Sequence, residues 1–371
     1  MPPARRIVVP DSVTTIDAVR RDTLRLLAPG TALRDGLERI LRGNTGALVI
    51  LGTDRTTDSM LSGGFPIDVP FSATRLRELA KMDGAIVVDS DVTTIISANV
   101  QLLPDPTIPT DETGTRHRTA DRVSKQTGFP VISVSKSMNM IALYQNGIRH
   151  VIEDSSAILA RANQAVATLE RYKMRLDEVQ RNLSALEIED LVTIRDVASV
   201  AQRTQMVLRI AEEIEAYVVE LGTDGRLISL QLEELMAGVA AERALILRDY
   251  TPLRIGRKTR TPEQAFADLD SLDSTQLLDL AAAATAIGFA AAPDLLDQPI
   301  SARGYGLLSL MPRIPESISE RIVAHFKSLK DLLAASTDDL QAVEGVGETR
   351  ARSIRDGLSR IAESKLMERF S

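Results

Sequence analysis

The chain has 371 residues, a formal net charge of −7 and no cysteine. Its length exceeds what a typical single core organises, so we expect two or three domains. Without cysteine, disulfides, thiolate metal sites and cysteine nucleophiles are excluded. The negative charge excludes a general attraction to nucleic acid, so any DNA contact must be local. No run reaches about 18 apolar residues and no signal-peptide core is present, so we expect a soluble, cytoplasmic protein that does not enter a membrane.

The first 150 residues combine apolar strands with amphipathic helices. Helices are predicted near 37–41, 73–81 and 116–127, and strands over 47–51, 85–88, 94–102, 131–134 and 140–144. Unbroken apolar strands interleaved with helices are typical of a sheet covered on both faces. Because strands and helices do not alternate strictly, we expect an α/β domain with a mixed central sheet.

Residues 151–300 read as an all-α spine, because glycine is absent between Gly147 and Gly222 and proline between Pro130 and Pro252. Positions 162, 169, 176 and 183 are Ala, Leu, Leu and Leu, and positions 165, 172, 179 and 186 are Ala, Tyr, Val and Leu. This heptad pattern fits either a helix packed within a bundle or a self-associating coiled coil. Further helices are predicted over about 188–220, 226–250, 262–270 and 274–290.

A basic loop interrupts the spine between residues 251 and 260. Four basic residues fall within seven positions there: Arg254, Arg257, Lys258 and Arg260. Such a loop either contacts phosphates or is simply solvated, and the sequence leaves both readings open.

Residues 301–371 read as short helices over 317–326, 328–334, 337–343 and 349–361. Gly345 and Gly347 separate the last two. Glycines at this spacing permit a turn with outward-pointing backbone N–H groups, where a DNA phosphate can approach closely. Arg350 and Arg352 add positive charge, and such contacts position a protein on DNA without reading sequence. Alternatively, the turn needs glycine for its geometry alone.

The phrase SLKDLLAASTDDLQAVEGVGETRARSIRDGL resembles the helix-hairpin-helix family over roughly 70 residues. The resemblance implies an all-α DNA-binding domain that contacts DNA through Gly345, Val346, Gly347, Thr349 and Arg350. Two hairpins usually form one unit in that family. The earlier one here would be residues 311–315, where prolines, which lack the N–H donor, replace the glycines.

The stretch 114–120, GTRHRTA, predicts an anion-binding helix N-terminus. Orphan N–H groups and the positive end of the helix dipole attract anions there. Arg116 and Arg118 add forked donors suited to phosphate oxygens. His117 taken alone is more typical of a structural histidine. By the same reasoning Asp83-Gly84 fits a plain turn and Ser135 a strand end facing solvent.

Together these residues indicate more. KMDGAIVVD and ANVQLLPDPTIPTDETGTRHRTADRVSKQTGFPVISVS resemble the diadenylate cyclase domain. With the helix-hairpin-helix tail, the whole chain resembles the DNA-integrity-scanning diadenylate cyclase family, which makes cyclic di-AMP from two ATP. We therefore expect a cyclase domain over 1–150, a helical spine over 151–300 and a DNA-binding domain over 301–371.

The resemblance implies the roles of individual residues. Asp83, Arg116, His117 and Arg118 would be catalytic, with Asp83 near the attacking 3′-hydroxyl as ligand of Mg²⁺ or Mn²⁺, base, or both. The nucleoside would contact Gly84, Ala85 and Leu102, and the triphosphate Thr115, Arg116, His117, Arg118, Thr119 and Ser135. Some branches of the family place a glutamate after the serine; Lys136 stands there here, so that role is not carried over.

The resemblance also implies partners: ATP, cyclic di-AMP, DNA and further copies of the chain. Two cyclase domains should meet face to face, and the natural assembly is an octamer associated with the nucleoid. The tail would sense branched or broken DNA and damp synthesis. Two other functions stay in view: a DNA-repair scaffold that only binds nucleotide, and an ATPase or kinase. The latter is disfavoured because the G-x-x-x-x-G-K-[ST] loop is absent.

Overall fold

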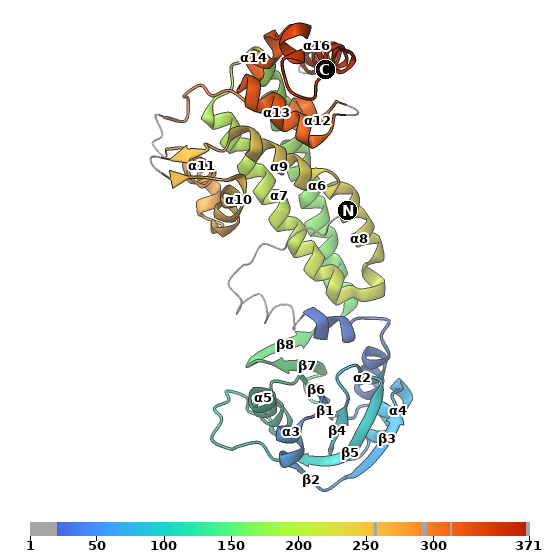
Figure 1. Cartoon of the computed structure of the whole chain (residues 1–371). Coiled ribbons are helices and arrows are strands. Elements are labelled where there is room, and N and C mark those ends of the chain that lie inside the picture. Colours follow the sequence, from blue (N-terminus) through green and yellow to red (C-terminus); the bar gives the residue numbers. More distant parts are fainter. Residues whose placement is uncertain (1–20, 256–257, 291–294, 312–313, 369–371) are drawn as a thin grey trace. The chain divides into compact units, whose positions relative to one another are not determined.

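The computed structural model describes residues 21–255, 258–290, 295–311 and 314–368 (Figure 1). The described residues form two compact units. One runs up to Gln164 and adds Ile214–Leu230; the other comprises Ala165–Glu213 and the chain from Gln231 onward. Two sequence predictions fall partly outside the described residues, namely positions 256–257 of the basic loop and 312–313 of the earlier hairpin.

The first unit is built on one mixed sheet of order β2-β5-β4-β1-β6-β7-β8, with β3 paired to β5. Its central strand β1 runs parallel to β4 and antiparallel to β6, which confirms the predicted mixed sheet. The strands are β1 Ala47–Leu51, β2 Leu61–Ser62, β3 Phe65–Pro70, β4 Ala85–Val88, β5 Thr94–Leu102, β6 Val131–Ser135, β7 Met140–Gln145 and β8 Ile148–Ile152.

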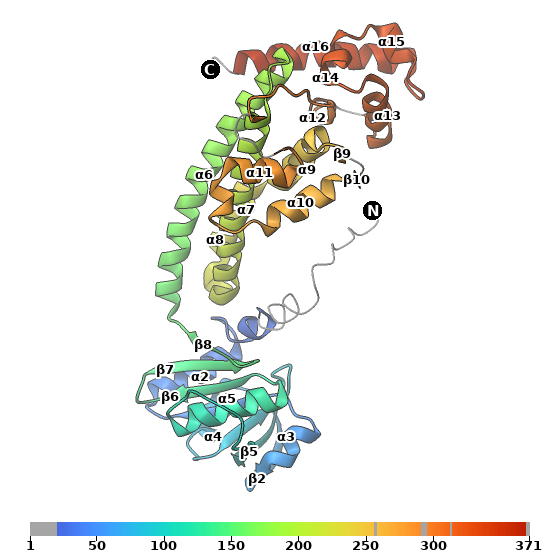
Figure 2. The same ribbon diagram turned by 90° about the vertical axis from the view of Figure 1, so that its left-hand side faces the viewer.

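Alternate residues of β1, β4, β6 and β7 enter two separate cores, as the period of two requires. On one face, Val49 and Ile86 pack with Leu37 of α2 and Leu76 of α4. On the other face, Ile50, Val87 and Val131 pack with Val123 of α5 and Met60 of α3. The helices are α2 Ala32–Arg42, α3 Arg55–Met60, α4 Ala73–Leu79 and α5 Thr115–Thr127. The sheet is therefore covered on both faces, as predicted (Figure 2).

The short elements α3, β2, β3 and β8 were not predicted. β3 runs Phe65–Pro70 with prolines at positions 66 and 70, and its side chains are mostly exposed. Proline and exposure are characteristic of an edge strand, which lacks the apolar signal used for prediction.

The spine consists of helices, as predicted, but two of the predicted helices are interrupted. The stretch 226–250 forms α8 Arg226–Met236 and α9 Val239–Tyr250, separated by Gly238 in the left-handed conformation at φ 82°. The stretch 274–290 contains the 3₁₀ helix η2 Gln276–Leu278 and then α11 Leu280–Ile287, which the Asp279 side chain caps. The other members are α6 Ser155–Glu189, α7 Ile194–Leu221 and α10 Pro262–Ser271.

The heptad leucines of α6 are buried inside a single chain. Leu169, Leu176 and Leu183 are 0%, 0% and 4% exposed, whereas Tyr172 and Val179 of the second series are only half-buried. Burial within one chain favours the bundle over the self-associating coiled coil.

Within the basic loop, β9 Arg254–Ile255 pairs antiparallel with β10 Lys258–Thr259. Arg260 donates to the carbonyl of Ile287 at 3.1 Å and to Asp268 at 2.7 Å. It therefore caps the C-terminus of α11 and is not the free phosphate ligand that the sequence allowed.

The C-terminal helices are α12 Tyr305–Ser309, α13 Glu316–Phe326, α14 Leu329–Ala334, α15 Thr337–Gln341 and α16 Glu348–Glu368. α16 lies alongside α14 and α15 (Figure 2). Of the helices in the described ranges, none combines the length and apolar character needed to cross a membrane.

Candidate functional site

A cavity of about 620 Å³ opens where β4, β5 and β6 meet the start of α5. Its wall contains residues that lie far apart in the sequence: Leu48, Asp83, Gly84, Ala85, Val100, Gln101, Leu102, Leu103, Gly114, Thr115, Arg116, His117, Thr119, Ser133, Val134, Ser135, Ser137 and Met138. This volume is within the usual range for small-molecule sites, roughly 300–1,000 Å³.

The N-terminus of α5 faces this cavity without a cap. Gly114 occupies the N-cap position and has no side chain to accept the first helical N–H groups. Thr115, Arg116 and His117 follow directly and line the wall. Free N–H groups, the helix dipole and a guanidinium at one place make an anion site.

Arg116 and Asp83 form an ion pair across the cavity mouth. Arg116 Nη2 donates to Asp83 Oδ1 at 3.1 Å. The Asp83 side chain is 98% exposed and that of Arg116 45% exposed. Exposed ion pairs contribute little to stability. Asp83 and Arg116 can therefore separate at small cost, and each can then bind a ligand.

His117 is buried and held by Tyr144, whose hydroxyl lies 2.8 Å from Nδ1. Burial lowers the pKa of His117 below its ordinary value and raises the pKa of Tyr144. The imidazole is therefore neutral at pH 7. His117 Nε2 and Ser133 Oγ, both in the cavity wall, are buried and have no hydrogen-bond partner among the described residues. Buried polar atoms of this kind usually have a partner, so these two are available to a ligand.

Gly84 is required by packing. A Cβ there would lie 2.4 Å from the backbone carbon of Asn99, which itself adopts φ 56° at an irregular point of the β4–β5 pairing. The Asp-Gly pair is thus more than a turn signal, because the glycine lets β5 pass directly behind the cavity floor.

The second candidate site is the turn between α15 and α16. Gly345 has φ 87°, and a Cβ there would lie 2.9 Å from both Ile318 and Arg321. Gly347 has open space where its Cβ would be. Val346 is buried, and the exposed Arg350 donates through Nη1 to the Gly345 carbonyl at 2.5 Å. Gly345 is therefore needed for the fold of the turn, whereas Gly347 is not.

Comparison with known proteins matches three family models to the chain. The DisA bacterial checkpoint controller nucleotide-binding model matches 34–149, its linker-region model matches 152–296, and the helix-hairpin-helix motif matches 308–366. The DNA integrity scanning protein DisA of Streptomyces coelicolor is 63% identical over 354 residues, covering 95% of each chain. That of Frankia casuarinae is also 63% identical, covering 95% of this chain and 98% of its own.

The chain belongs to the DisA family of DNA integrity scanning proteins.

A solved structure, DacA from Staphylococcus aureus in a double-mutant form, is 20% identical, covering 37% of this chain and 90% of its own. Its TM-score of 0.29 is too low to bear on the fold. The DisA nucleotide-binding model contains the whole cavity, and the helix-hairpin-helix motif contains the Gly345 turn. The domain limits at 150 and 300 stay a prediction.

The cavity of this DisA-family chain collects most of the residues singled out from sequence. It contains Asp83, Gly84, Ala85, Leu102, Thr115, Arg116, His117, Thr119 and Ser135. Arg118 is outside the wall, where its Nε donates to the Glu112 carbonyl at 3.4 Å. Within the described ranges, no three His, Asp or Glu side chains are placed to share a metal ion.

Several wall residues were missed. Ser133 could have been found, because it precedes Ser135 by two positions on β6 and so shares its face. Gln101, Leu103, Ser137 and Met138 carry no comparable signal, since each flanks a wall residue at a strand end or in the following turn.

Proposed function

We propose that the chain is a diadenylate cyclase that converts two ATP into cyclic di-AMP and two diphosphates. The 3′-oxygen of each ATP would bond to the α-phosphorus of the other, with loss of its proton and release of diphosphate. The observation that carries the proposal is the cavity, where Asp83-Gly84-Ala85 meets the uncapped start of α5 beside Arg116. Phosphoryl transfer needs mainly such positioning and charge neutralisation.

Within the cavity the nucleoside and the triphosphate of ATP would contact different parts of the wall, one apolar and one polar. Gly84, Ala85 and Leu102 would contact the nucleoside, joined by the apolar Leu48 and Val100 of the same wall. Thr115, Arg116, Thr119 and Ser135 would hold the triphosphate. His117, held by Tyr144 at Nδ1, would turn Nε2 toward the triphosphate, and the tautomer that carries its proton on Nε2 would donate to a phosphate oxygen.

Arg118 keeps its proposed role only if its guanidinium leaves the Glu112 carbonyl. That bond is long at 3.4 Å and exposed, so a phosphate can replace it at little cost.

A divalent cation fits the donors present. Asp83 is the single carboxylate of the cavity wall and is fully accessible. Mg²⁺ is commonly bound through one or two carboxylates plus substrate phosphates, and Mn²⁺ favours similar oxygen ligands. Asp83 would hold such an ion, which would supply charge neutralisation at the phosphates. As a residue beside the 3′-hydroxyl, Asp83 would also orient that hydroxyl or accept its proton.

Ring closure requires two nucleotides, so we propose that two cavities face each other. Leu103 and Met138 on the cavity rim are 60% and 50% exposed, which suits contact with a second copy. An octamer remains our proposal for the whole assembly, and light scattering would test it.

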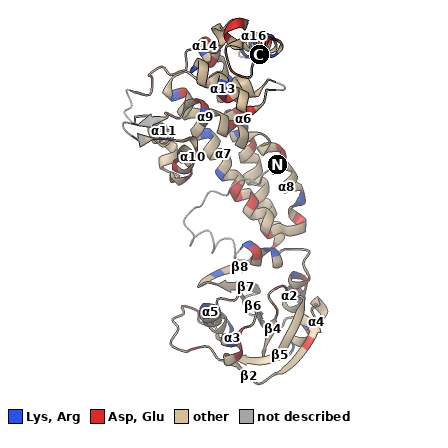
Figure 3. Cartoon of the chain, viewed as in Figure 1, with Lys and Arg blue, Asp and Glu red and all other residues tan. Residues whose placement is uncertain are grey.

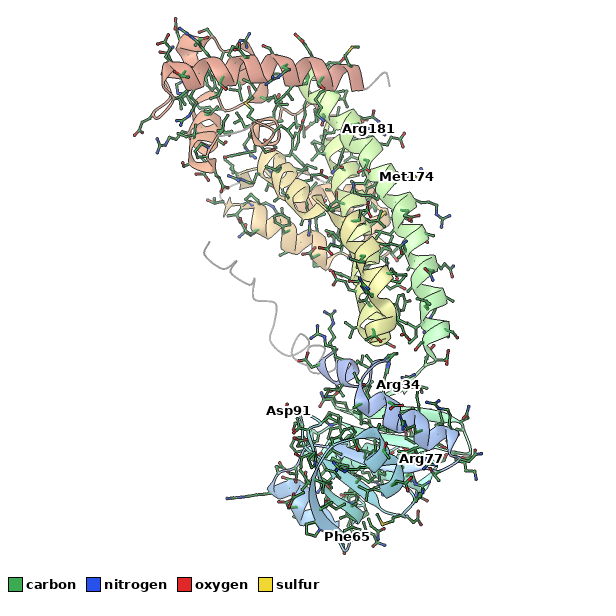
Figure 4. All side chains as sticks on the ribbon, turned by 90° about the vertical axis from the view of Figure 1, so that its right-hand side faces the viewer. Arg34, Phe65, Arg77, Asp91, Met174 and Arg181 are labelled. Atoms are coloured by element: carbon green, nitrogen blue, oxygen red, sulfur yellow. The ribbon has the colours of Figure 1, made fainter. Side chains whose placement is uncertain are left out.

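Incubation with ATP and Mn²⁺ tests the reaction. Cyclic di-AMP should form, Asp83→Asn should abolish it, and Asp91→Asn, an exposed carboxylate of the same unit (Figure 4), should not. Well-folded protein that forms no cyclic di-AMP would support the nucleotide-binding repair scaffold instead. ADP as the main product would support an ATPase.

We also propose that the C-terminal turn binds DNA by its backbone and that branched or damaged DNA damps synthesis in a nucleoid-associated enzyme. Gly345 and Gly347 would offer backbone N–H groups, and Thr349 and Arg350 exposed side chains. The buried Val346 donates its own N–H to the Val343 carbonyl at 3.0 Å, so it would hold the turn in shape for DNA and not donate to a phosphate. Addition of junction DNA should slow cyclic di-AMP formation, whereas an unchanged rate would refute the coupling.

A further inference from the structure

The second unit contains a pocket of about 550 Å³ that the cyclase proposal does not use. Its wall is formed by Arg171, Tyr172 and Arg175 of α6, Gln202, Arg203 and Met206 of α7, and Leu278 of η2. Each long helix thus contributes positions i, i+1 and i+4, which lie on one helical face.

Three arginines and no carboxylate line this pocket. Among the described residues, none of the three forms an ion pair. The chain as a whole carries a net charge of −7, and acidic and basic segments are interspersed along the spine helices (Figure 3). The pocket is therefore a local concentration of positive charge in an acidic protein.

Two details show that the charges of these arginines are not balanced within the pocket. Arg171 and Arg175 are like charges four residues apart on one helix, an arrangement that is destabilising without a counter-ion. Arg203 Nε is buried and has no hydrogen-bond partner in the part of the chain that the structure describes. A buried donor without a partner is destabilising, so its retention needs a reason.

Hydrogen bonds of the residues around the pocket fix parts of its wall in place. Gln202 Nε2 donates to the Leu277 carbonyl at 2.7 Å and fixes α7 to the 3₁₀ helix η2. Arg171 donates to the Ala167 carbonyl at 3.2 Å and to Thr168 Oγ1 at 3.3 Å, which holds its stem along α6. Arg175 makes no hydrogen bond with other described residues and is free to close over a ligand.

We propose that this pocket binds a small polyphosphate anion, independently of the proposed cyclase site. Guanidinium forks match phosphate oxygens, and three of them suit a ligand with several phosphate groups. The volume is that of a small-molecule site rather than of a long groove for a nucleic-acid strand. Tyr172, Met206 and Leu278 add an apolar side to the same wall.

The absence of cysteine allows a local reporter. Leu278 is 71% exposed at the pocket, so Leu278→Cys places the single thiol of the chain there for an environment-sensitive dye. Titration of the labelled full-length protein with inorganic tripolyphosphate should give a saturable change. Arg175→Gln should weaken tripolyphosphate binding about tenfold, because charged hydrogen bonds are lost. The double variant Arg175→Gln, Arg203→Gln should weaken it further.

Matched controls separate this pocket from other anion sites. Arg181→Gln removes an exposed arginine of the same helix outside the pocket (Figure 4), and Arg116→Ala alters the other cavity. Neither should change the tripolyphosphate affinity read at Cys-labelled position 278. Arg203→Lys, which keeps the charge, controls for loss of packing, and thermal unfolding confirms the fold of each variant.

Three outcomes would overturn the proposal. The first is a label that fails to respond to tripolyphosphate or responds equally in the double variant. The second is a dye that responds to short duplex DNA but not to free tripolyphosphate. The third is a changed oligomeric state of the Arg175→Gln, Arg203→Gln variant in light scattering with no tripolyphosphate response in the parent, which would assign the arginines to contact between copies.

Discussion

At the scale of single residues, glycines decide where the key side chains can lie. Arg116 reaches the cavity across Gly46, where a Cβ would come 2.4 Å from its Nη1 and 3.1 Å from the Val134 carbonyl. The backbone at Gly46 does not have positive φ, so alanine is conformationally allowed. A substitution at Gly46 therefore tests the position of the Arg116 guanidinium while leaving the arginine itself unchanged.

Gly46→Ala should displace the Arg116 guanidinium and weaken ATP binding about tenfold, the value of one charge-assisted hydrogen bond. Calorimetric titration with ATP would measure it. In an Arg116→Ala background the same substitution should have little further effect, because the affected group is already gone. Additive losses would show that Gly46 acts through something else. DNA binding should survive both changes, and a joint loss would argue against separate sites.

His117 gives a pH prediction. Burial lowers its folded pKa below the ordinary value of 6.5, so the unfolded chain binds a proton more readily. The stability from neutral His117 is complete above pH 6.5 and declines as the pH falls from there toward the folded pKa. Urea unfolding at pH 7 and at steps down to pH 5 should show this loss, and His117→Gln should make it smaller. An equal pH dependence in the variant would exclude His117 as a source.

At the scale of elements, α6 shows why a heptad pattern does not by itself imply a coiled coil. Its leucines at 169, 176 and 183 are buried within one chain, while Met174 on the same helix is 63% exposed (Figure 4). A repeat of seven fits any long helix with one covered face.

Leu176→Ala should reduce the free energy of unfolding by about 2–5 kcal/mol, the usual cost of truncating a buried leucine. Met174→Ala should change it by less than about 0.5 kcal/mol, because surface substitutions seldom matter. Urea unfolding at several protein concentrations would measure both. A Leu176→Ala loss that appeared only at high concentration would instead support self-association through this seam.

At the scale of the whole molecule, the two family-matched functions are carried by separate ends of the sequence. In the tail, Gly345 and Gly347 differ in what they contribute. Of the two, Gly345 combines positive φ with close neighbours, so it is needed for the fold of the turn, whereas Gly347 is not. A methyl group at 347 enters open space, where a DNA phosphate would have to approach.

Gly347→Ala should therefore weaken binding of junction DNA several-fold while the helices keep their stability and the basal cyclase rate stays unchanged. Fluorescence anisotropy with labelled DNA, thermal unfolding and a cyclase assay would measure the three. Gly345→Ala is the contrasting variant, which should lose stability as well. If Gly347→Ala bound DNA normally, the turn would have only a structural role.

Local sequence patterns predicted the apolar strands β1, β4, β5, β6 and β7 and the main helices, and together with the family resemblance they predicted nine of the eighteen residues of the cavity wall. Apolar runs such as 47–51 and the glycine-flanked turn at 114 are local patterns, and the quoted motifs carry the family resemblance. Which side chains meet depends on the tertiary structure. It joined Asp83 to Arg116, placed Ser133 in the wall, moved Arg118 outside it, and showed Arg260 capping a helix. Those outcomes depend on strand pairing and on contacts between residues distant in sequence, which a local pattern does not contain.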